Sequence, residues 1–143
     1  MGVVDIYGER VLRQVDVSLG SICRVLGRAG FESRECGEYI AIDEPGFVVI
    51  ITLAGDPSNK IWYSTRQDFK ARVSPRRRLQ LANRINRRNV GTAYVDGNTL
   101  CVWNTMSFEG GIFVENIVHT MHQFRELLEH VLLEEVNGEL DWD

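Results

Sequence analysis

The spacing of hydrophobic residues along the chain alternates between helical and strand-like periods, and these changes predict the order of its elements. A first helix is expected over about 18–29, because apolar residues recur there three or four positions apart. Ser18 is a favourable N-cap for this helix, and Gly30 follows as a terminator. A last helix is expected over about 114–136, with a single apolar stripe and a polar opposite face.

A second helix lies between these two in the sequence. Ser74 is its predicted N-cap and Pro75 takes the first helical position, where a missing N–H costs nothing. The helix is expected to end at Val90 and Gly91. Four residues form its predicted apolar arc: Leu79, Leu81, Ala82 and Ile85.

Five shorter segments have the composition and period of strands. They are residues 39–42, 47–53, 61–67, 92–95 and 99–106. The run 47–53 is almost continuously apolar, which indicates a strand that is central or covered on both faces. Asp96-Gly97-Asn98 predicts a hairpin between the last two strands. The short connections favour a five-stranded antiparallel sheet in the order α-β-β-β-α-β-β-α. We therefore predict a two-layer α+β domain, with the first and last helices on one face of the sheet.

Length and composition limit the domain organisation and the compartment. The 143 residues suit one domain, taken as residues 18–136, with an N-terminal extension over 1–17 and an acidic tail over 137–143 that should fray. Three widely spaced cysteines favour reduced thiols in a cytoplasm. The charged amino terminus contains no apolar signal core, and no segment is apolar enough to cross a membrane.

The sequence contains no motif that carries a recognised chemistry. There is no nucleophile elbow, phosphate-binding glycine loop or HExxH pattern, so we identify no catalytic residues and expect no cofactor. These absences do not exclude catalysis, and a small enzyme with a pocket that the sequence does not reveal is a further hypothesis. His119 and His122 are three residues apart on the last helix and could in principle share an ion. Because they lie beside glutamates on the polar face, we interpret them as solvent-exposed histidines and expect no metal site.

Positive charge is concentrated in residues 66–88, which hold nine basic residues and one acid, although the whole chain has a net charge of −4. This block favours contact with an anion or with the acidic part of a second copy, while a solvated basic face explains it as well. The pI near 5.4 and the lack of a nucleic-acid-binding motif argue against nucleic acid. The candidate contacts are Arg76, Arg77, Arg84, Arg87 and Arg88.

Three sequence motifs resemble the YbjN family, a group of candidate bacterial sensory transduction regulators with the fold of type III secretion chaperones. They are Leu81-Ala82-Asn83-Arg84-Ile85-Asn86, Ala93-Tyr94-Val95-Asp96-Gly97-Asn98-Thr99-Leu100, and Glu109-Gly110-Gly111-Ile112 followed by Glu115-Asn116. Relatives often have serine or threonine where this chain has Phe113.

The resemblance implies a non-enzymatic protein whose molecular activity is not established. It also implies a homodimer formed through the second helix and the neighbouring strands, with a protein client as a further partner. Leu81, Trp103 and Phe113 are the candidate dimer or client contacts. The alternative function is an anion or nucleic-acid binder that uses the arginine face of the second helix.

Overall fold

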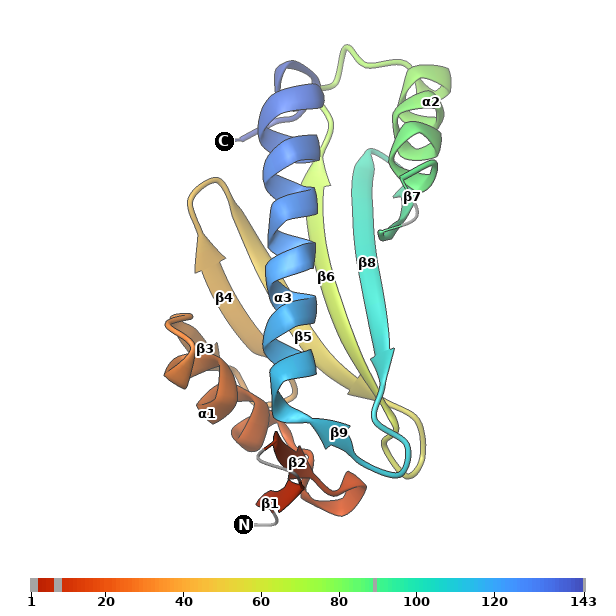
Figure 1. The fold of residues 1–143 in the computed structure, drawn as a ribbon. Helices are drawn as coiled ribbons and strands as arrows, with labels where there is room; N and C mark the ends of the chain where they lie inside the picture. The colour runs from red at the N-terminus through yellow and green to blue at the C-terminus, as the bar shows by residue number, and fades with distance from the viewer. Residues whose placement is uncertain (1–2, 7–8, 89, 143) are drawn as a thin grey trace.

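The protein is built on a six-stranded antiparallel sheet, which is curled around its longest helix (Figure 1). The computed structural model describes residues 3–6, 9–88 and 90–142. In spatial order the strands are β3 (Ser33–Glu35), β4 (Ile40–Glu44), β5 (Phe47–Ala54), β6 (Lys60–Asp68), β8 (Thr99–Ser107) and β7 (Thr92–Asp96). The five predicted strands and their antiparallel pairing are confirmed. For this sheet the predicted number of strands is one too low, because β3 is three polar residues long and has no hydrophobic alternation.

A second, smaller sheet lies beside the start of the last helix. It joins β1 (Val3–Ile6), β2 (Glu9–Leu12) and β9 (Ile112–Phe113). Leu12 and Val17 are buried in the main hydrophobic core. Residues of the expected N-terminal extension therefore pack as part of the domain.

The first and last helices begin where their sequences indicate. Helix α1 (Leu19–Arg28) is capped by Ser18, whose hydroxyl accepts from the backbone N–H of Ser21 at 3.0 Å. Gly30 follows this helix with a φ of 94°. Helix α3 (Val114–Leu128) continues as a π-helical segment (Glu129–Glu135), so the helical run ends within one residue of its predicted end.

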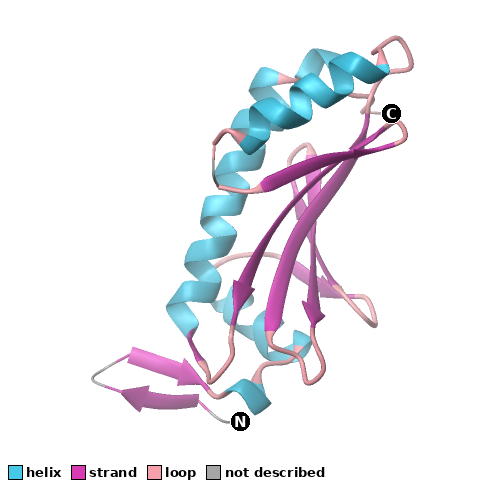
Figure 2. Ribbon diagram, turned by 90° about the vertical axis from the view of Figure 1, so that its right-hand side faces the viewer, coloured by secondary structure: helices cyan, strands magenta, loops and turns pink. Residues whose placement is uncertain are grey.

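The core lies between α3 and the inner face of the sheet. Phe124 of α3 is fully buried, and its ring centroid lies 6.3 Å from that of Tyr63 on β6. The Tyr63 hydroxyl donates to the carbonyl oxygen of Ile117 at 3.2 Å, which satisfies a buried polar group, and burial raises the pKa of this phenol. In the described part of the chain both α1 and α3 lie on this side of the sheet, and no helix covers the other face (Figure 2).

Helix α2 (Pro75–Asn86) lies against β7 at one edge of the sheet. It ends at Asn86, earlier than expected. The Asn86 side chain accepts from the Ala93 N–H at 2.6 Å and donates to the Ala93 carbonyl at 2.9 Å. The apolar arc is also narrower than predicted: Leu81, Ala82 and Ile85 are buried, but Leu79 is 57% exposed. A helix that packs mainly against an edge strand buries a smaller part of its circumference than one lying across the middle of a sheet.

The described part of the acidic tail, residues 137–142, packs against the end of β6, whereas the sequence predicts that the tail frays. Leu140 is fully buried and forms an antiparallel bridge with Phe69. The Lys70 N–H donates to the Glu139 carbonyl at 2.9 Å, and the Asp141 N–H donates to the Asp68 carbonyl at 2.8 Å. The chain after α3 thus returns to the end of β6 and pairs there.

Candidate protein-interaction surface

Two tryptophans are stacked on the face of the sheet that no described helix covers. The register pairs Trp62 with Thr105 and Trp103 with Ser64, so both indoles project from the same face. Their ring centroids are 4.6 Å apart and their planes differ by 20°. We call this surface the open face. It carries Ala41, Val48, Ile50, Thr52, Trp62, Ser64, Thr92, Tyr94, Trp103 and Thr105.

Strand β5 shows why the open face is unusual for an isolated chain. Val49 and Ile51 point into the core and are fully buried. The alternate residues Val48 and Ile50 point to the open face, where Val48 is 40% exposed and Ile50 is half-buried. A strand that is apolar on both faces is typical of a sheet covered on both sides. The described chain supplies only one of these covers.

Ion pairs flank the apolar centre of the open face. On one side the Arg34 guanidinium binds the Asp43 carboxylate through two hydrogen bonds of 2.8 and 3.0 Å. On the other side a guanidinium nitrogen of Arg66 donates to the Asp96 carboxylate at 3.2 Å. An apolar centre within a polar rim is the usual arrangement of a protein–protein interface.

Two aromatic side chains of the open face, Trp62 and Tyr94, carry polar groups. The Trp62 indole N–H is enclosed and has no hydrogen-bond acceptor among the described residues. Tyr94 is 48% exposed, and a hydrogen bond with Cys101 raises the pKa of its phenol. Each buried donor without a partner costs about 1–3 kcal/mol, so this surface is not optimised for the isolated chain.

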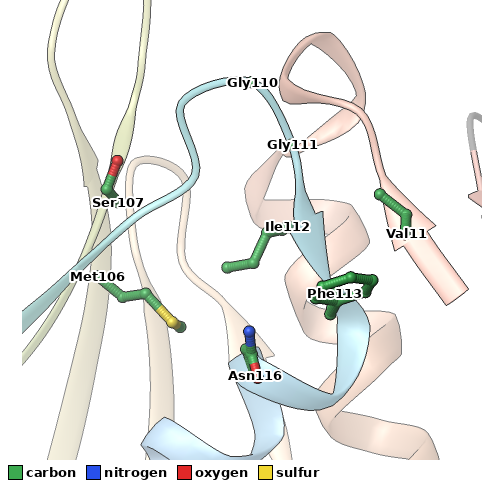
Figure 3. A pocket seen from close by; sticks show the side chains of 8 residues that line it. All are labelled: Val11, Met106, Ser107, Gly110, Gly111, Ile112, Phe113 and Asn116. Atoms are coloured by element: carbon green, nitrogen blue, oxygen red, sulfur yellow. The ribbon is translucent and has the colours of Figure 1, made fainter. Parts of the chain in front are cut away.

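A separate apolar pocket of about 340 Å³ lies beside the start of α3 (Figure 3). Phe113 occupies the N-cap position, has extended backbone angles, supplies no capping hydrogen bond and is 40% exposed. Two residues earlier, Gly111 has a φ of 123°. A Cβ at this glycine would lie 3.1 Å from the Leu12 carbonyl oxygen. Only glycine fits this turn without strain. The pocket, which we call the Phe113 pocket, is lined by Val11, Met106, Ser107, Gly110, Gly111, Ile112, Phe113 and Asn116.

The three candidate dimer or client contacts lie in three different environments. Trp103 is on the open face, and Phe113 lines the Phe113 pocket. Leu81 is fully buried in the core of the chain itself, so its prediction as a surface contact is wrong. It lies on the side of α2 that packs against the domain, whereas Leu79 is the exposed apolar residue of that helix.

The arginine face of α2 is partly neutralised within the chain. Arg77 binds the Glu139 carboxylate through hydrogen bonds of 2.9 and 3.0 Å. Arg78 donates to the Gly97 carbonyl at 3.1 Å, and its guanidinium lies 5.8 Å from the centre of the Phe69 ring. The remaining candidate arginines are exposed: Arg76, Arg84, Arg87 and Arg88. The ordered tail thus compensates part of the positive charge at the start of this helix.

Replacing Glu139 by glutamine should lower the stability of the protein at pH 7. The hydrogen bonds from Arg77, with the nearby charges of Arg72 and Arg84, hold the pKa of the Glu139 carboxyl below its usual value of 4.5. A depressed folded-state pKa contributes stability above pH 4.5, and this contribution is lost as the pH falls through the depressed value. Urea unfolding from pH 7 to pH 3 should therefore show the Glu139→Gln and wild-type curves converging at low pH.

The carboxyl of Glu109 is exposed, makes no side-chain hydrogen bond or ion pair with the described residues, and provides a matched control. Glu109→Gln should follow the wild-type stability at every pH. A difference between Glu139→Gln and wild type that stays constant down to pH 3 would contradict the role of the Arg77 ion pair.

The histidines of α3 have other neighbours in the structure. Within the residues that the structure describes, no three His, Cys, Asp or Glu side chains are close enough together to hold an ion. His122 instead accepts a hydrogen bond from Arg125 at 3.1 Å and lies against the Phe31 ring. None of the described helices combines the length and the apolar character needed to cross a membrane.

A curled antiparallel sheet with helices on one face is the architecture of the type III secretion chaperone-like α+β fold. No protein-family model and no curated protein matches the chain. The crystal structure of YbjN from E. coli, a candidate transcription regulator, is similar with a TM-score of 0.71 and 22% identity, covering 87% of this chain and 96% of YbjN.

Two structures of secretion chaperone complexes are also similar. In the HopA1–SchA chaperone–effector complex the matching chain gives a TM-score of 0.52 at 12% identity, with coverage of 79% of this chain and 86% of the other. The Yersinia pestis type III secretion chaperone SycH, solved with a fragment of YscM2, gives a TM-score of 0.50 at 16% identity. The match covers 80% of this chain and 94% of SycH. The resemblance expected from the sequence motifs is confirmed at the level of the fold.

Sequence analysis did not identify Trp62 and Tyr94 as contact residues, although the alternation of their strands was visible. The alternation places Trp62 on the opposite face of the sheet from Tyr63, and Tyr94 on the opposite face from Ala93. What the pattern does not supply is which face the helices cover. The stacking of Trp62 on Trp103 depends on the β6–β8 register, which brings together two residues that are 41 positions apart in the sequence (103 − 62 = 41).

Proposed function

We propose that this chain is a non-catalytic, chaperone-like protein-interaction module that works in the cytoplasm as a homodimer. The observation that carries the proposal is the open face, an apolar sheet surface with a stacked tryptophan pair and a charged rim. The similar solved structures, a candidate transcription regulator and two secretion chaperones in complexes with protein partners, support a role in binding proteins.

A second copy is the occupant that we propose for the open face. Two open faces related by a twofold axis would bury the centre around Trp103 and Val48, and each rim would meet charges of both signs. Helix α2 flanks this surface at the β7 edge, so Arg84 and Arg87 are available to acids of the other subunit. A contact of ordinary size, about 800 Å² on each subunit, fits a sheet of this extent.

The wild-type protein tests this proposal directly. Sedimentation velocity between about 1 and 100 µM should give a mass of twice the 16.3 kDa of one chain. A single-chain mass over the whole concentration range would contradict the homodimer.

The Phe113 pocket is the proposed anchor point for a protein client. Its walls include Val11, Met106 and Ile112, and Phe113 itself is exposed at the rim. An apolar side chain from an extended client segment would fill such a pocket. The pocket is separate from the open face, so a client and a second subunit can be held together.

Phe113→Ser should reduce client capture at least tenfold, since an aromatic anchor contributes about 2 kcal/mol or more to an interface. The measurement is a quantitative pull-down from the native cell extract with tagged wild-type and variant protein. Lys70→Gln, at an exposed position after β6, is the control and should capture the same proteins as wild type. Equal capture by Phe113→Ser would place the client elsewhere.

A further inference from the structure

A second pocket of about 300 Å³ lies on the other side of the start of α3, between that helix, α1 and β2. Figure 1 shows these three elements converging near the amino terminus. Its floor is made of the aliphatic side chains of Val25, Val114 and Val118, with Ala29 beside them. Val114 is buried, and Val25 and Val118 pack partly against the core. The floor is therefore a fixed apolar surface.

Cationic and hydrogen-bond-donating groups gather along the rim of this pocket. Arg10 and Arg28 line it, are exposed, and make no side-chain hydrogen bond or ion pair within the described residues. Glu115 is the one acid among the residues lining the pocket, so the arginines outnumber the carboxylates there. A pair of unpartnered guanidinium groups beside an apolar floor favours an anionic group attached to an apolar body.

His122 adds an oriented donor to the same pocket. Arg125 always carries its protons, so its 3.1 Å hydrogen bond to Nδ1 of His122 makes that nitrogen the acceptor. In the neutral imidazole the proton then lies on Nε2. Phe31 packs against the ring, with centroids 4.9 Å apart, and Arg125 lies over the Phe31 ring at 5.1 Å. The orientation of this imidazole is thus fixed from two sides.

We propose that this pocket binds a small aliphatic carboxylate. The carboxylate would accept from Arg28 and from His122 Nε2–H, and its chain would lie over Val25, Val114 and Val118. At about 30 Å³ for each non-hydrogen atom, the volume suits a ligand of roughly ten such atoms. A ligand of this size bound at a half-open site should have a dissociation constant on the order of a millimolar.

Octanoate is a suitable probe, because it has ten non-hydrogen atoms and one charge. Titration of the full-length protein below the micelle concentration, followed by ¹⁵N and imidazole chemical shifts, should move the resonances of Val118, His119 and His122 in a saturable way. Octanol and octylamine keep the chain and remove or invert the charge, and each should bind at least tenfold more weakly.

Arg28→Gln should weaken octanoate binding about tenfold, while Lys70→Gln, at an exposed position after β6, should leave it unchanged. Because Arg28 makes no side-chain hydrogen bond or ion pair within the described chain, the variant should fold normally, which circular dichroism would verify. Three results would overturn the proposal: no saturable shift in the pocket, equal binding of octanol, or an unchanged affinity in Arg28→Gln. Phe113→Ser should bind octanoate normally, which separates this site from the proposed client pocket.

Discussion

Replacing Trp103 by glutamate is expected to weaken self-association at least a hundredfold. Trp103 is stacked on Trp62 at the centre of the open face, and buried tryptophans at the centres of interfaces each contribute about 2 kcal/mol or more. Glutamate removes this contact and places two carboxylates, one from each subunit, near the twofold axis, where their repulsion adds to the loss. Sedimentation equilibrium over a wide concentration range would measure the change.

Loss of the tryptophan stack could also disturb the fold, so a matched pair of variants separates the two effects. Val48→Glu introduces the same charge on β5 at the open face without touching either indole. Val15→Glu makes the identical substitution at a position that is 84% exposed and lies outside the sheet. Val48→Glu should dissociate the dimer and Val15→Glu should not. Dimers of equal strength in both variants would show that the open face is not the subunit contact.

Phe124→Ala should reduce the free energy of unfolding by about 3–5 kcal/mol, a large fraction of the roughly 5–15 kcal/mol available to a domain of this kind. Phe124 is fully buried between α3 and the sheet, next to Tyr63. The lost apolar contact and the cavity left behind both contribute to the cost, because neighbouring side chains relax only in part. Urea unfolding at one fixed protein concentration would measure it.

The adjacent residue on the same helix supplies the control. Gln123 is exposed, so Gln123→Ala should change the unfolding free energy by no more than about 0.5 kcal/mol. A cost below about 1 kcal/mol for Phe124→Ala would mean that α3 does not form the main cover of the inner face.

The parts of the fold that the sequence predicts are those determined by local chemistry. Ser18 and Ser74 cap their helices as expected, because a capping hydroxyl acts on an N–H only three residues away. The five longer strands were recognisable from their period and turns. Strands β1, β2, β3 and β9 were not, since none of them is longer than four residues and such short runs do not establish an alternation.

The remaining differences arise from contacts between distant segments. Leu140 lies between two acids, Glu139 and Asp141, and its pairing with Phe69 gives it a buried position. Leu79 fits the apolar arc of α2, but the helix packs on an edge and leaves that residue in solvent. The lining of each pocket is likewise drawn from elements far apart in the chain, so spacing alone gives no sign of it.

The two hydrogen bonds between the Asn86 side chain and the backbone N–H and C=O of Ala93 restrict how copies of this protein can associate. An uncovered sheet edge offers a template on which further chains can add end to end, as they do in fibrils. Here the amide of Asn86 already occupies that template in the middle of β7, and the opposite edge ends in the short, charged strand β3. Growth along the hydrogen-bonding direction is therefore blocked at both borders, and copies of this protein can meet face to face without polymerising.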